Sequence, residues 1–327
     1  MNDLDPQPDR PERRWFLRRL LRAGLGGLGI GALGWAFWDR RGPQSGEESP
    51  SNDPLPDYSI PGQARRLAMV HGADRGASVT AALAALGGME RFIQTGDRVL
   101  LKVNAAFAAP PMIGATTHPE VVTRVARLCF EAGAHQVLVT DNPINDPASC
   151  FALTGIAAAA QAAGAQLLLP TDQRFENYSL PNGRLIRRWP LLRAPLRQVN
   201  KVIGLAPVKD HHRSGASMTL KNWYGLLGGR RNIFHQEIHT IIAELAMLIR
   251  PTLVILDGTA SMMRNGPTGG SLDDLKPTQT LIAGTDPVAV DAAGAALLDK
   301  TVDDLPYLRM AERLGVGTVD YRSILVK

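Results

Sequence analysis

The chain has 327 residues, of which 45% are hydrophobic and 20% are charged. These proportions are typical of globular domains, and the length suits one large domain or two modest ones. The formal net charge is +5, but residues 1–41 contain eight arginines and five acidic residues, so only +2 belongs to the remainder. Because no basic patch with interleaved aromatic residues is present, the composition argues against a nucleic-acid-binding protein.

The first 41 residues have the layout of an export signal, which is basic, then apolar, then polar. The segments with this layout are Arg13-Arg14-Trp15-Phe16-Leu17, the run 24–38, and Asp39-Arg40-Arg41. The arginine pair followed by Phe-Leu resembles the twin-arginine signal, so the Tat translocation machinery is an expected partner. Glu12 stands where that signal usually has Ser or Thr. The alternative, a basic arm before a core helix, is disfavoured by the six glycines of the run 24–38.

The same segment favours an uncleaved membrane anchor over a released periplasmic protein. No Ala-x-Ala triplet follows the apolar run. The run 24–38 is shorter than the roughly 20 residues that span hydrocarbon, and it extends only past Arg22, whose long side chain can snorkel. We therefore expect residues 1–41 to be a Tat-type signal or anchor in the cytoplasmic membrane, with the body on the periplasmic or exported side. Residues 42–57, rich in Pro, Ser, Gly and acids, are expected to be a flexible linker to a domain at 58–327.

The body alternates between β-type and helical patterns. The predicted strands are 98–103, 136–140, 166–169, 201–205, 252–256 and 280–283, and the predicted helices are 119–132, 157–163, 235–249 and 286–298. Strands alternating with helices indicate right-handed crossovers and parallel pairing. The expected fold class is therefore α/β, a mainly parallel sheet with helices on both faces in a Rossmann-like three-layer arrangement, as one domain or two subdomains.

Polar residues follow these strands repeatedly. They are Lys102 and Asn104, Asp141 and Asn142, Lys209 to His212, Asp257, and Asp286. For Asp286, which precedes a proline, a helix cap is the favoured interpretation. Because ligands of such sheets gather at the carboxyl ends of strands, the other residues predict one binding pocket there.

The motifs at these positions resemble the DUF362 domain family, which has no assigned general activity. The matching pieces are Lys102-Val103-Asn104, Thr117-His118-Pro119-Glu120-Val121-Val122, Pro207-x-Lys209-x-His211, Leu220-Lys221-Asn222-x-x-Gly225, His235-Gln236-Glu237-Ile238, Leu256-Asp257-Gly258, Gly266-Pro267, and Asp286-Pro287-Val288-Ala289-Val290-Asp291. They occur in the family's order over roughly residues 67 to 300. Many family members carry a ferredoxin-like module, but Cys129 and Cys150 do not have the spacing of iron–sulfur ligands. The two cysteines form either a disulfide or two buried thiols.

The residue types suggest roles in one site. Lysines can bind a carboxylate or phosphate as point charges, asparagines can orient a polar ligand, and histidines can serve as bases or metal ligands. The predicted catalytic residues are His211, Lys209, Lys221 and Asp257, with Asp257 orienting His211 or balancing its charge. The predicted substrate-binding residues are Lys102, Asn104, His118, Asn222 and Asp141, and the predicted metal ligands are His118, His211 and His235. A surface or core role is the alternative for each histidine.

Three further segments have simpler interpretations. His235 and His239 are four residues apart and would share one face of the predicted helix; we expect His239 to face solvent and keep His235 as a candidate ligand. The segment 225–231 lacks the spacing of a phosphate loop and is expected to be a flexible connector. The segment 265–270 is expected to be a mobile loop at the rim of the site.

Two functional classes follow. The first is an exported protein that binds a small anionic substrate or a metal-containing cofactor, with or without catalysis. The order strand–Asn, Thr-His-Pro, strand–Asp is loosely similar to nickel-pincer lactate racemases, an analogy at the level of the fold. The alternative is a non-catalytic protein that binds or delivers a cofactor to a membrane redox complex. The identity of any metal or cofactor is left open.

Overall fold

The computed structural model describes residues 53–326. The predicted signal or anchor at 1–41 and most of the linker lie outside these residues. The end of the linker, 53–57, has no helix or strand, and Asp57 pairs with Arg250 at 3.3 Å. No helix within 53–326 is both long enough and apolar enough to cross a membrane.

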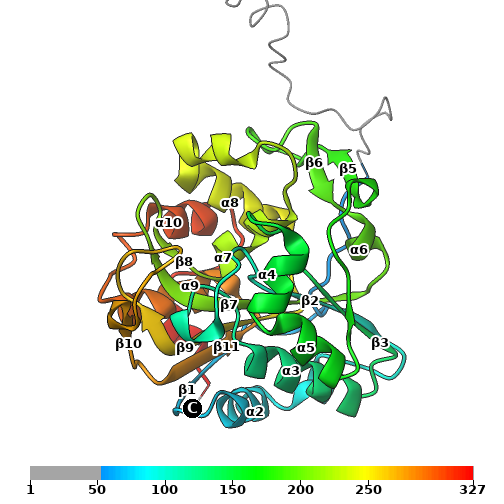
Figure 1. Cartoon of the computed structure of the whole chain (residues 1–327), viewed down its shortest axis with the longest axis vertical. Coiled ribbons are helices and arrows are strands. Elements are labelled where there is room, and N and C mark those ends of the chain that lie inside the picture. The colour runs from blue at the N-terminus through cyan, green and yellow to red at the C-terminus, as the bar shows by residue number, and fades with distance from the viewer. Residues whose placement is uncertain (1–52, 327) are drawn as a thin grey trace, which may run out of the picture. The chain divides into compact units, whose positions relative to one another are not determined.

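A nine-stranded sheet runs through the described residues (Figure 1). Its central strands are parallel, in the order β9 (Leu253–Met262), β7 (Lys201–His211), β2 (Arg98–Lys102), β3 (Gln136–Thr140) and β4 (Gln166–Leu167). Four strands pair antiparallel with their neighbours: β11 (Thr280–Gly284), β1 (Leu67–His71), β10 (Leu275–Lys276) and β8 (Gly215–Ser217). A separate hairpin joins β5 (Phe175–Tyr178) to β6 (Trp189–Leu192). The mainly parallel α/β fold is thus confirmed.

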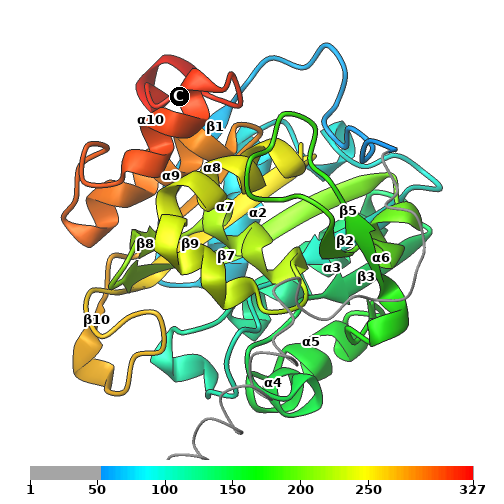
Figure 2. The ribbon, with the colours of Figure 1, turned by 90° about the horizontal axis from the view of Figure 1, so that it is seen from above.

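Helices cover both faces of the sheet. One face carries α2 (Arg75–Ala85), α3 (Pro119–Glu131) and α5 (Ile156–Ala162). The opposite face carries α8 (Ile238–Leu248) and α10 (Pro306–Arg313), as Figure 1 shows. Figure 2 shows α7 (Thr219–Asn222), α8 and α9 (Pro287–Ala295) side by side over β7 and β9. The other helices are α4 (Pro147–Leu153) and α6 (Ala194–Arg197), with short 3₁₀ segments at Met89–Arg91, Pro111–Ile113, Asp172–Arg174, Trp223–Leu226, Arg231–Glu237, Leu272–Asp274, Ala296–Leu298 and Tyr321–Ile324.

Successive side chains along a strand point to opposite faces of the sheet, so each strand contributes to both hydrophobic cores. Leu253 and Ile255 belong to the cluster under α2 and α3, whereas Val254 and Leu256 belong to the cluster under α8 and α9. Such alternation is what a sheet buried on both faces requires. Residue 257 continues the first series, which directs Asp257 toward α2.

Two strands are longer than the sequence patterns predicted. β7 extends to His211 rather than ending at Leu205, and β9 extends to Met262 rather than Leu256. The interruption that suggested an end in β7 is Pro207, which lies where the register between β7 and β9 shifts. A proline is tolerated at such an irregularity. Lys209 and His211 are therefore strand residues and not part of a loop.

Asp286 lies at a different edge of the sheet from the other polar residues that follow strands, because β11 is antiparallel to β9. Because β11 runs opposite to β9, its end lies at the amino edge of the parallel strands, away from the other polar strand ends. There the Asp286 carboxylate accepts hydrogen bonds from the backbone N–H groups of Val288 and Ala289, both at 3.0 Å. Asp286 is thus the N-cap of α9, as the favoured interpretation predicted.

The predicted helix 235–249 begins later than expected. Residues Arg231–Glu237 form a 3₁₀ segment, and the α-helix starts only at Ile238. His235 and His239 consequently lie on different elements and do not share a helical face. His239 is half-buried, with its ring stacked 6.1 Å from Tyr307 between centroids, rather than facing solvent.

Candidate functional site

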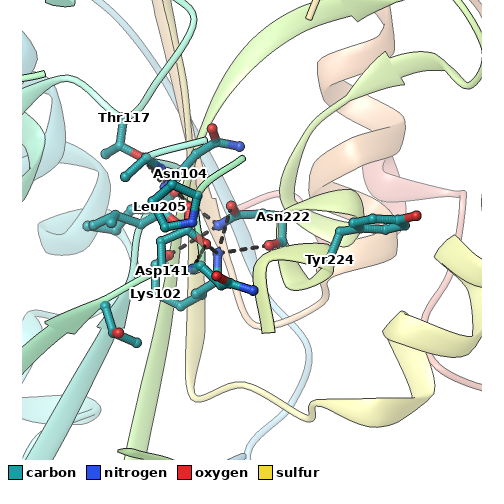
Figure 3. Close-up of polar contacts among 12 residues, drawn as sticks. Lys102, Asn104, Thr117, Asp141, Leu205, Asn222 and Tyr224 are labelled. Carbon is teal, nitrogen blue, oxygen red and sulfur yellow. Dashed lines mark hydrogen bonds and ion pairs between the residues drawn. The ribbon is translucent and has the colours of Figure 1, made fainter. Parts of the chain in front are cut away.

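A buried ion pair joins the ends of two neighbouring parallel strands (Figure 3). Lys102 is the last residue of β2 and Asp141 directly follows β3, and their Nζ and Oδ1 atoms are 2.7 Å apart. Burial lowers the pKa of Lys102, whereas the carboxylate of Asp141 opposes that shift. The other Asp141 oxygen accepts a hydrogen bond from the backbone N–H of Ala105 at 2.6 Å. The pair thus connects the loop after β2 to the end of β3.

Asn222, the last residue of α7, completes this arrangement. Its amide nitrogen donates to the carbonyl oxygens of Lys102 and Leu205, both at 3.1 Å, which joins α7 to β2 and β7. In return, Lys102 Nζ donates to the Asn222 carbonyl oxygen at 2.8 Å. The predicted substrate-binding residues Lys102, Asp141 and Asn222 therefore do converge, but their polar groups bind one another. Their geometry is that of an internal support and not of free ligand-binding groups.

Gly225 lies directly against the ion pair. A Cβ atom at this position would be 1.9 Å from Asp141 Oδ1 and 2.8 Å from Lys102 Nζ. The Gly225 carbonyl oxygen also accepts a hydrogen bond from the backbone N–H of Asn142 at 3.0 Å. The start of the segment 225–231, expected to be a flexible connector, is instead packed on the support, because only glycine permits so close an approach.

Asn104 and Lys209 form a second contact at the same edge. Lys209 Nζ is 3.4 Å from Asn104 Oδ1 and also donates to the carbonyl oxygen of Ala115. The ammonium lies 5.2 Å from the centroid of the Phe107 ring. Burial, followed by the nearby charge of Lys221, lowers the pKa of Lys209 to about 7. The predicted convergence of Asn104 and Lys209 is observed, and Lys209 has no carboxylate partner among the described residues.

Lys221 makes fewer contacts than Lys102 and Lys209, the other two lysines of this edge. Within residues 53–326 its ammonium forms no hydrogen bond and no ion pair; it lies 5.2 Å from the centroid of the Tyr224 ring. The side chain is partly exposed. Burial and the charge of Arg231 lower the pKa of Lys221 to about 8. A positive charge in this setting can still accept an anionic partner.

Arg231 was not among the predicted site residues. Its guanidinium donates to four carbonyl oxygens, those of Tyr224, Leu227, Asn142 and Pro143, at 2.7–3.2 Å. None of these neutral acceptors cancels its charge. The only signal in the sequence was the Arg230-Arg231 pair after a glycine-rich stretch, which does not reveal contacts to a loop some 90 residues earlier.

The contacts of His211 do not favour the role predicted for it. Its Nδ1 atom accepts hydrogen bonds from the backbone N–H groups of Arg213 and Ser214, both at 3.2 Å. In the neutral ring the proton then resides on Nε2, which can donate but cannot accept a proton or bind a metal. Burial, then the charge of Lys221, lowers the pKa of His211 to about 2. These contacts favour a neutral hydrogen-bond donor over a general base or metal ligand.

Three imidazole rings stack at this point. The His211 ring lies 4.9 Å from the His212 ring and 5.8 Å from the His235 ring, between centroids. The Nδ1 atom of His235 is 3.2 Å from both Tyr224 Oη and the carbonyl oxygen of Asn232. We refer to Lys209, Lys221, Arg231, His211 and His235 as the basic cluster.

Asp257 and His118 belong to a different environment. The Asp257 carboxylate pairs with Arg75 Nε of α2 at 2.9 Å and accepts from the backbone N–H of Thr259 at 2.9 Å. His118 is the N-cap of α3, and burial followed by the charge of Arg75 lowers its pKa. Asp257 therefore neither orients His211 nor hydrogen-bonds to it.

The predicted metal ligands are not assembled. His118 caps α3, whereas His211 ends β7 and His235 lies in the 3₁₀ segment before α8. Among the described residues, no three or more His, Cys, Asp and Glu side chains are grouped so that they could hold one metal ion. Both cysteines are free and buried, which corresponds to the two-thiol alternative.

Asp291 of α9 ends one of the family-like motifs but was not among the predicted site residues. Its carboxylate accepts from Thr219 Oγ1 at 2.5 Å and from the backbone N–H groups of Thr219 and Leu220 at 2.8 and 3.0 Å. These bonds satisfy the free N–H groups at the start of α7. Burial raises the pKa of Asp291 to about 7. The short helix that carries Lys221 and Asn222 is thus held at both ends.

The fold and this edge define an α/β protein with buried lysines at the carboxyl ends of its parallel strands. The chain belongs to the family described as Domain of unknown function (DUF362), which matches residues 99–296. A thylakoid-associated protein from Synechocystis sp. is 29% identical over 249 residues, covering 74% of this chain and 75% of that protein. The lactate racemase apoprotein from Thermoanaerobacterium thermosaccharolyticum is a solved structure with 12% identity and a TM-score of 0.38, covering 73% of this chain and 57% of that one. So distant a likeness says nothing about the activity of this chain.

Proposed function

We propose that the basic cluster binds a small anionic ligand, a carboxylate or a phosphate. The observation that carries this proposal is Lys221, a partly exposed ammonium without a hydrogen bond or ion pair among residues 53–326. Burial is the main cause of the lowered pKa of Lys209, His211 and His235, and the charge of Lys221 is the next cause for each. An anion beside Lys221 would relieve this repulsion between like charges, and the neutral Nε2–H of His211 could donate to it.

Lys209 gives the same site a group suited to proton transfer. Because its pKa is about 7, both the ammonium and the amine are populated at neutral pH. A group with a pKa near the working pH is the most effective general acid or base. Asn104 holds the nitrogen in place at 3.4 Å. For a catalysed proton transfer at this site, we therefore propose Lys209 rather than His211 as the acid or base.

Isothermal titration calorimetry with inorganic phosphate and with malonate tests the binding proposal. We expect saturable binding of at least one of these probes by the full chain, and its loss in Lys221→Met. The matched control is Lys276→Met, because Lys276 is exposed and paired with Asp299 at 2.8 Å. Equal affinity of Lys221→Met and the native chain would contradict the proposal, as would the absence of binding by either probe.

We also propose that the chain is anchored to the cytoplasmic membrane with its body on the exported side. The support is the basic–apolar–polar layout of residues 1–41, together with the similarity to a protein described as thylakoid-associated. Membrane fractionation should find the full chain in the membrane pellet after a high-salt wash, and a chain beginning at residue 42 in the supernatant. Recovery of both forms in the same fraction would contradict anchoring by this segment.

A further inference from the structure

Lysine is scarce in this chain and is placed unevenly. The sequence contains seven lysines against 29 arginines. Three of the seven, Lys102, Lys209 and Lys221, lie at the carboxyl edge of the parallel strands. Arginine forms ion pairs and binds anions as well as lysine does, but it cannot lose its proton near neutral pH. What lysine alone can add at such an edge is a neutral, nucleophilic amine.

Lys209 is the lysine whose surroundings favour this neutral amine. Its nitrogen contacts the side-chain oxygen of Asn104 at 3.4 Å, the carbonyl oxygen of Ala115, and the Phe107 ring, whose centroid is 5.2 Å away. All three partners are uncharged. Burial, followed by the charge of Lys221, lowers the pKa of Lys209 to about 7. A lysine that is desolvated and lies near a second cation is activated for attack on a carbonyl group.

The other lysines of the described residues are in different environments. Four of them have a carboxylate oxygen at 2.7–3.9 Å, which favours the charged ammonium. These four are Lys102, Lys201, Lys276 and Lys300. Lys221 has no such partner within 53–326, but it is partly exposed and is the cation that suits an incoming anion. Lys209 and Lys221 thus offer two complementary groups, an amine and an ammonium.

The nitrogen of Lys209 lies close beneath the surface. The residue itself is 1% exposed. Phe107, whose ring lies over the ammonium, is partly exposed. It is the one large side chain in Ala105-Ala106-Phe107-Ala108-Ala109. A small ligand that displaces the Phe107 ring therefore reaches Lys209 without entering the core of the sheet.

We propose that Lys209 forms an imine with the keto group of a small 2-oxo acid, whose carboxylate is held by Lys221. The inference rests on the proposed binding of an anion by the basic cluster, and it adds the second functional group of that ligand. A 2-oxo acid has its carboxylate directly bonded to the keto carbon, so it matches an amine and a cation that are near each other. Lys221 is close enough for its charge to lower the pKa of Lys209.

The proposed step needs no oxidant or reductant. The lone pair of the Lys209 amine attacks the keto carbon and forms a C–N bond. Both N–H protons of the amine then leave with the keto oxygen as one molecule of water, and the imine C=N bond is formed. Covalent intermediates of this kind divide one difficult step into two easier ones.

Reductive trapping with pyruvate tests this inference. The full chain is incubated near neutral pH with pyruvate and sodium cyanoborohydride, which reduces an imine to a stable secondary amine, and peptide mapping by mass spectrometry locates the modified lysine. We expect one adduct on Lys209 and none on Lys276, the exposed and paired control. Acetone, a ketone without a carboxylate, should be trapped less than pyruvate. In Lys221→Met this preference for pyruvate should fall about tenfold, because a hydrogen bond to a charged group is lost.

Mapping of the native chain locates the adduct without any variant, so a folding defect cannot obscure the result. Phe107→Ala, which removes the cover, should be trapped faster than the native chain. If Lys209 is unmodified in both chains while malonate still binds in calorimetry, the inference is overturned and the proposed function stands. Equal modification of Lys209 and Lys276, or equal trapping of pyruvate and acetone by the native chain, also overturns the inference. A chain that neither traps pyruvate nor binds malonate or phosphate overturns both.

Discussion

At the scale of single residues, the three lysines Lys102, Lys209 and Lys221 of the carboxyl edge fall into two kinds. Lys102 has a carboxylate at 2.7 Å and three further acceptors on Val103 and Asn222. Lys209 contacts only uncharged oxygen atoms, and Lys221 contacts an aromatic face. A buried charge is stable only when it is compensated. Lys102 is compensated and supports the fold, whereas Lys209 and Lys221 have no negative partner among the described residues and could bind one.

Removing one partner of the buried pair should be strongly destabilising. Asp141→Asn keeps the size of the side chain but leaves the Lys102 ammonium, which is 0% exposed, without its counter-charge. We expect a loss of about 3–5 kcal/mol in the free energy of unfolding, the usual cost of leaving a buried charge uncompensated. Urea titration followed by circular dichroism measures it. Lys276→Met, at an exposed pair, should change stability by only about 0.5 kcal/mol. Similar values for the two variants would contradict the distinction.

The lowered pKa of Lys209 has a signature in the pH dependence of stability. The folded pKa is about 7 and the ordinary value is 10.5, so between these values the unfolded chain binds more protons than the folded one. Stability attributable to this group must therefore rise from pH 7 toward pH 10. We expect the unfolding free energy of the native chain to increase relative to that of Lys209→Met between pH 7 and pH 9.5. The titration of Lys221 is common to both proteins and largely cancels. A pH-independent difference would show that Lys209 titrates normally.

Sequence patterns located many of the important residues but not their partners. The motifs placed Lys102, Asn104 and Lys209 at strand ends or beyond, and all three lie at one edge. Their roles depend on contacts across 39 to 120 residues of chain, such as Lys102 with Asp141 and with Asn222, which no local spacing encodes. The tautomer of His211 likewise depends on two backbone N–H groups in the following turn, and these contacts favour a hydrogen-bond donor over the predicted base.

At the scale of elements, the site depends on how α7 is held. This helix has only four residues and would not be stable alone. Asp291 of α9 binds its first N–H groups, and Asn222 binds β2 and β7 at its other end. Lys221 therefore has a fixed position although it makes no strong contact of its own.

Gly225 is the position where this support tolerates least change. A methyl group in Gly225→Ala would overlap the Asp141 carboxylate, at 1.9 Å from its Oδ1 atom, and would displace either the ion pair or the end of α7. We expect a loss of about 1–3 kcal/mol, the range for overpacking, by chemical denaturation. Gly270→Ala is the matched control, because a Cβ atom there meets nothing within 4 Å. Unchanged stability of Gly225→Ala would mean that the pair moves aside without cost.

The errors in element boundaries have definite physical causes. Short strands with parallel neighbours, such as 136–140, were predicted to the residue because β-branched and apolar side chains are continuous there. β7 was predicted too short because Pro207 and Lys209 resemble loop residues, although their neighbours in space complete the ladder. β1 was not predicted at all, because its place beside β11 follows from pairing across more than 200 residues.

At the scale of the whole molecule, the amino and carboxyl edges of the sheet have different characters in the described residues. The carboxyl edge carries the basic cluster, whereas Asp286 caps α9 and pairs with Arg65 at the amino edge. The α/β class and the parallel core were predictable from the alternation of patterns. The antiparallel pairing of β1 and β11 was not predictable, because periodicity carries no information about strand direction. This pairing is the reason that Asp286 lies at the amino edge.

The first 41 residues are expected to determine where the whole chain is located. Replacing Arg13 and Arg14 together by lysine preserves the charge but removes the planar guanidinium groups, whose hydrogen-bonding geometry an ammonium cannot reproduce. If the segment is a twin-arginine signal, the double variant should stay in the cytoplasm with a folded body, because the described domain at 53–326 does not contain these residues. Protease accessibility of intact spheroplasts measures this: the native chain should be degraded from outside and the double variant protected. The control is Arg40→Lys with Arg41→Lys, which lies after the apolar run and should be degraded like the native chain. Degradation of the Arg13/Arg14 variant from outside would contradict the twin-arginine prediction while leaving anchoring by the apolar run possible through another export route.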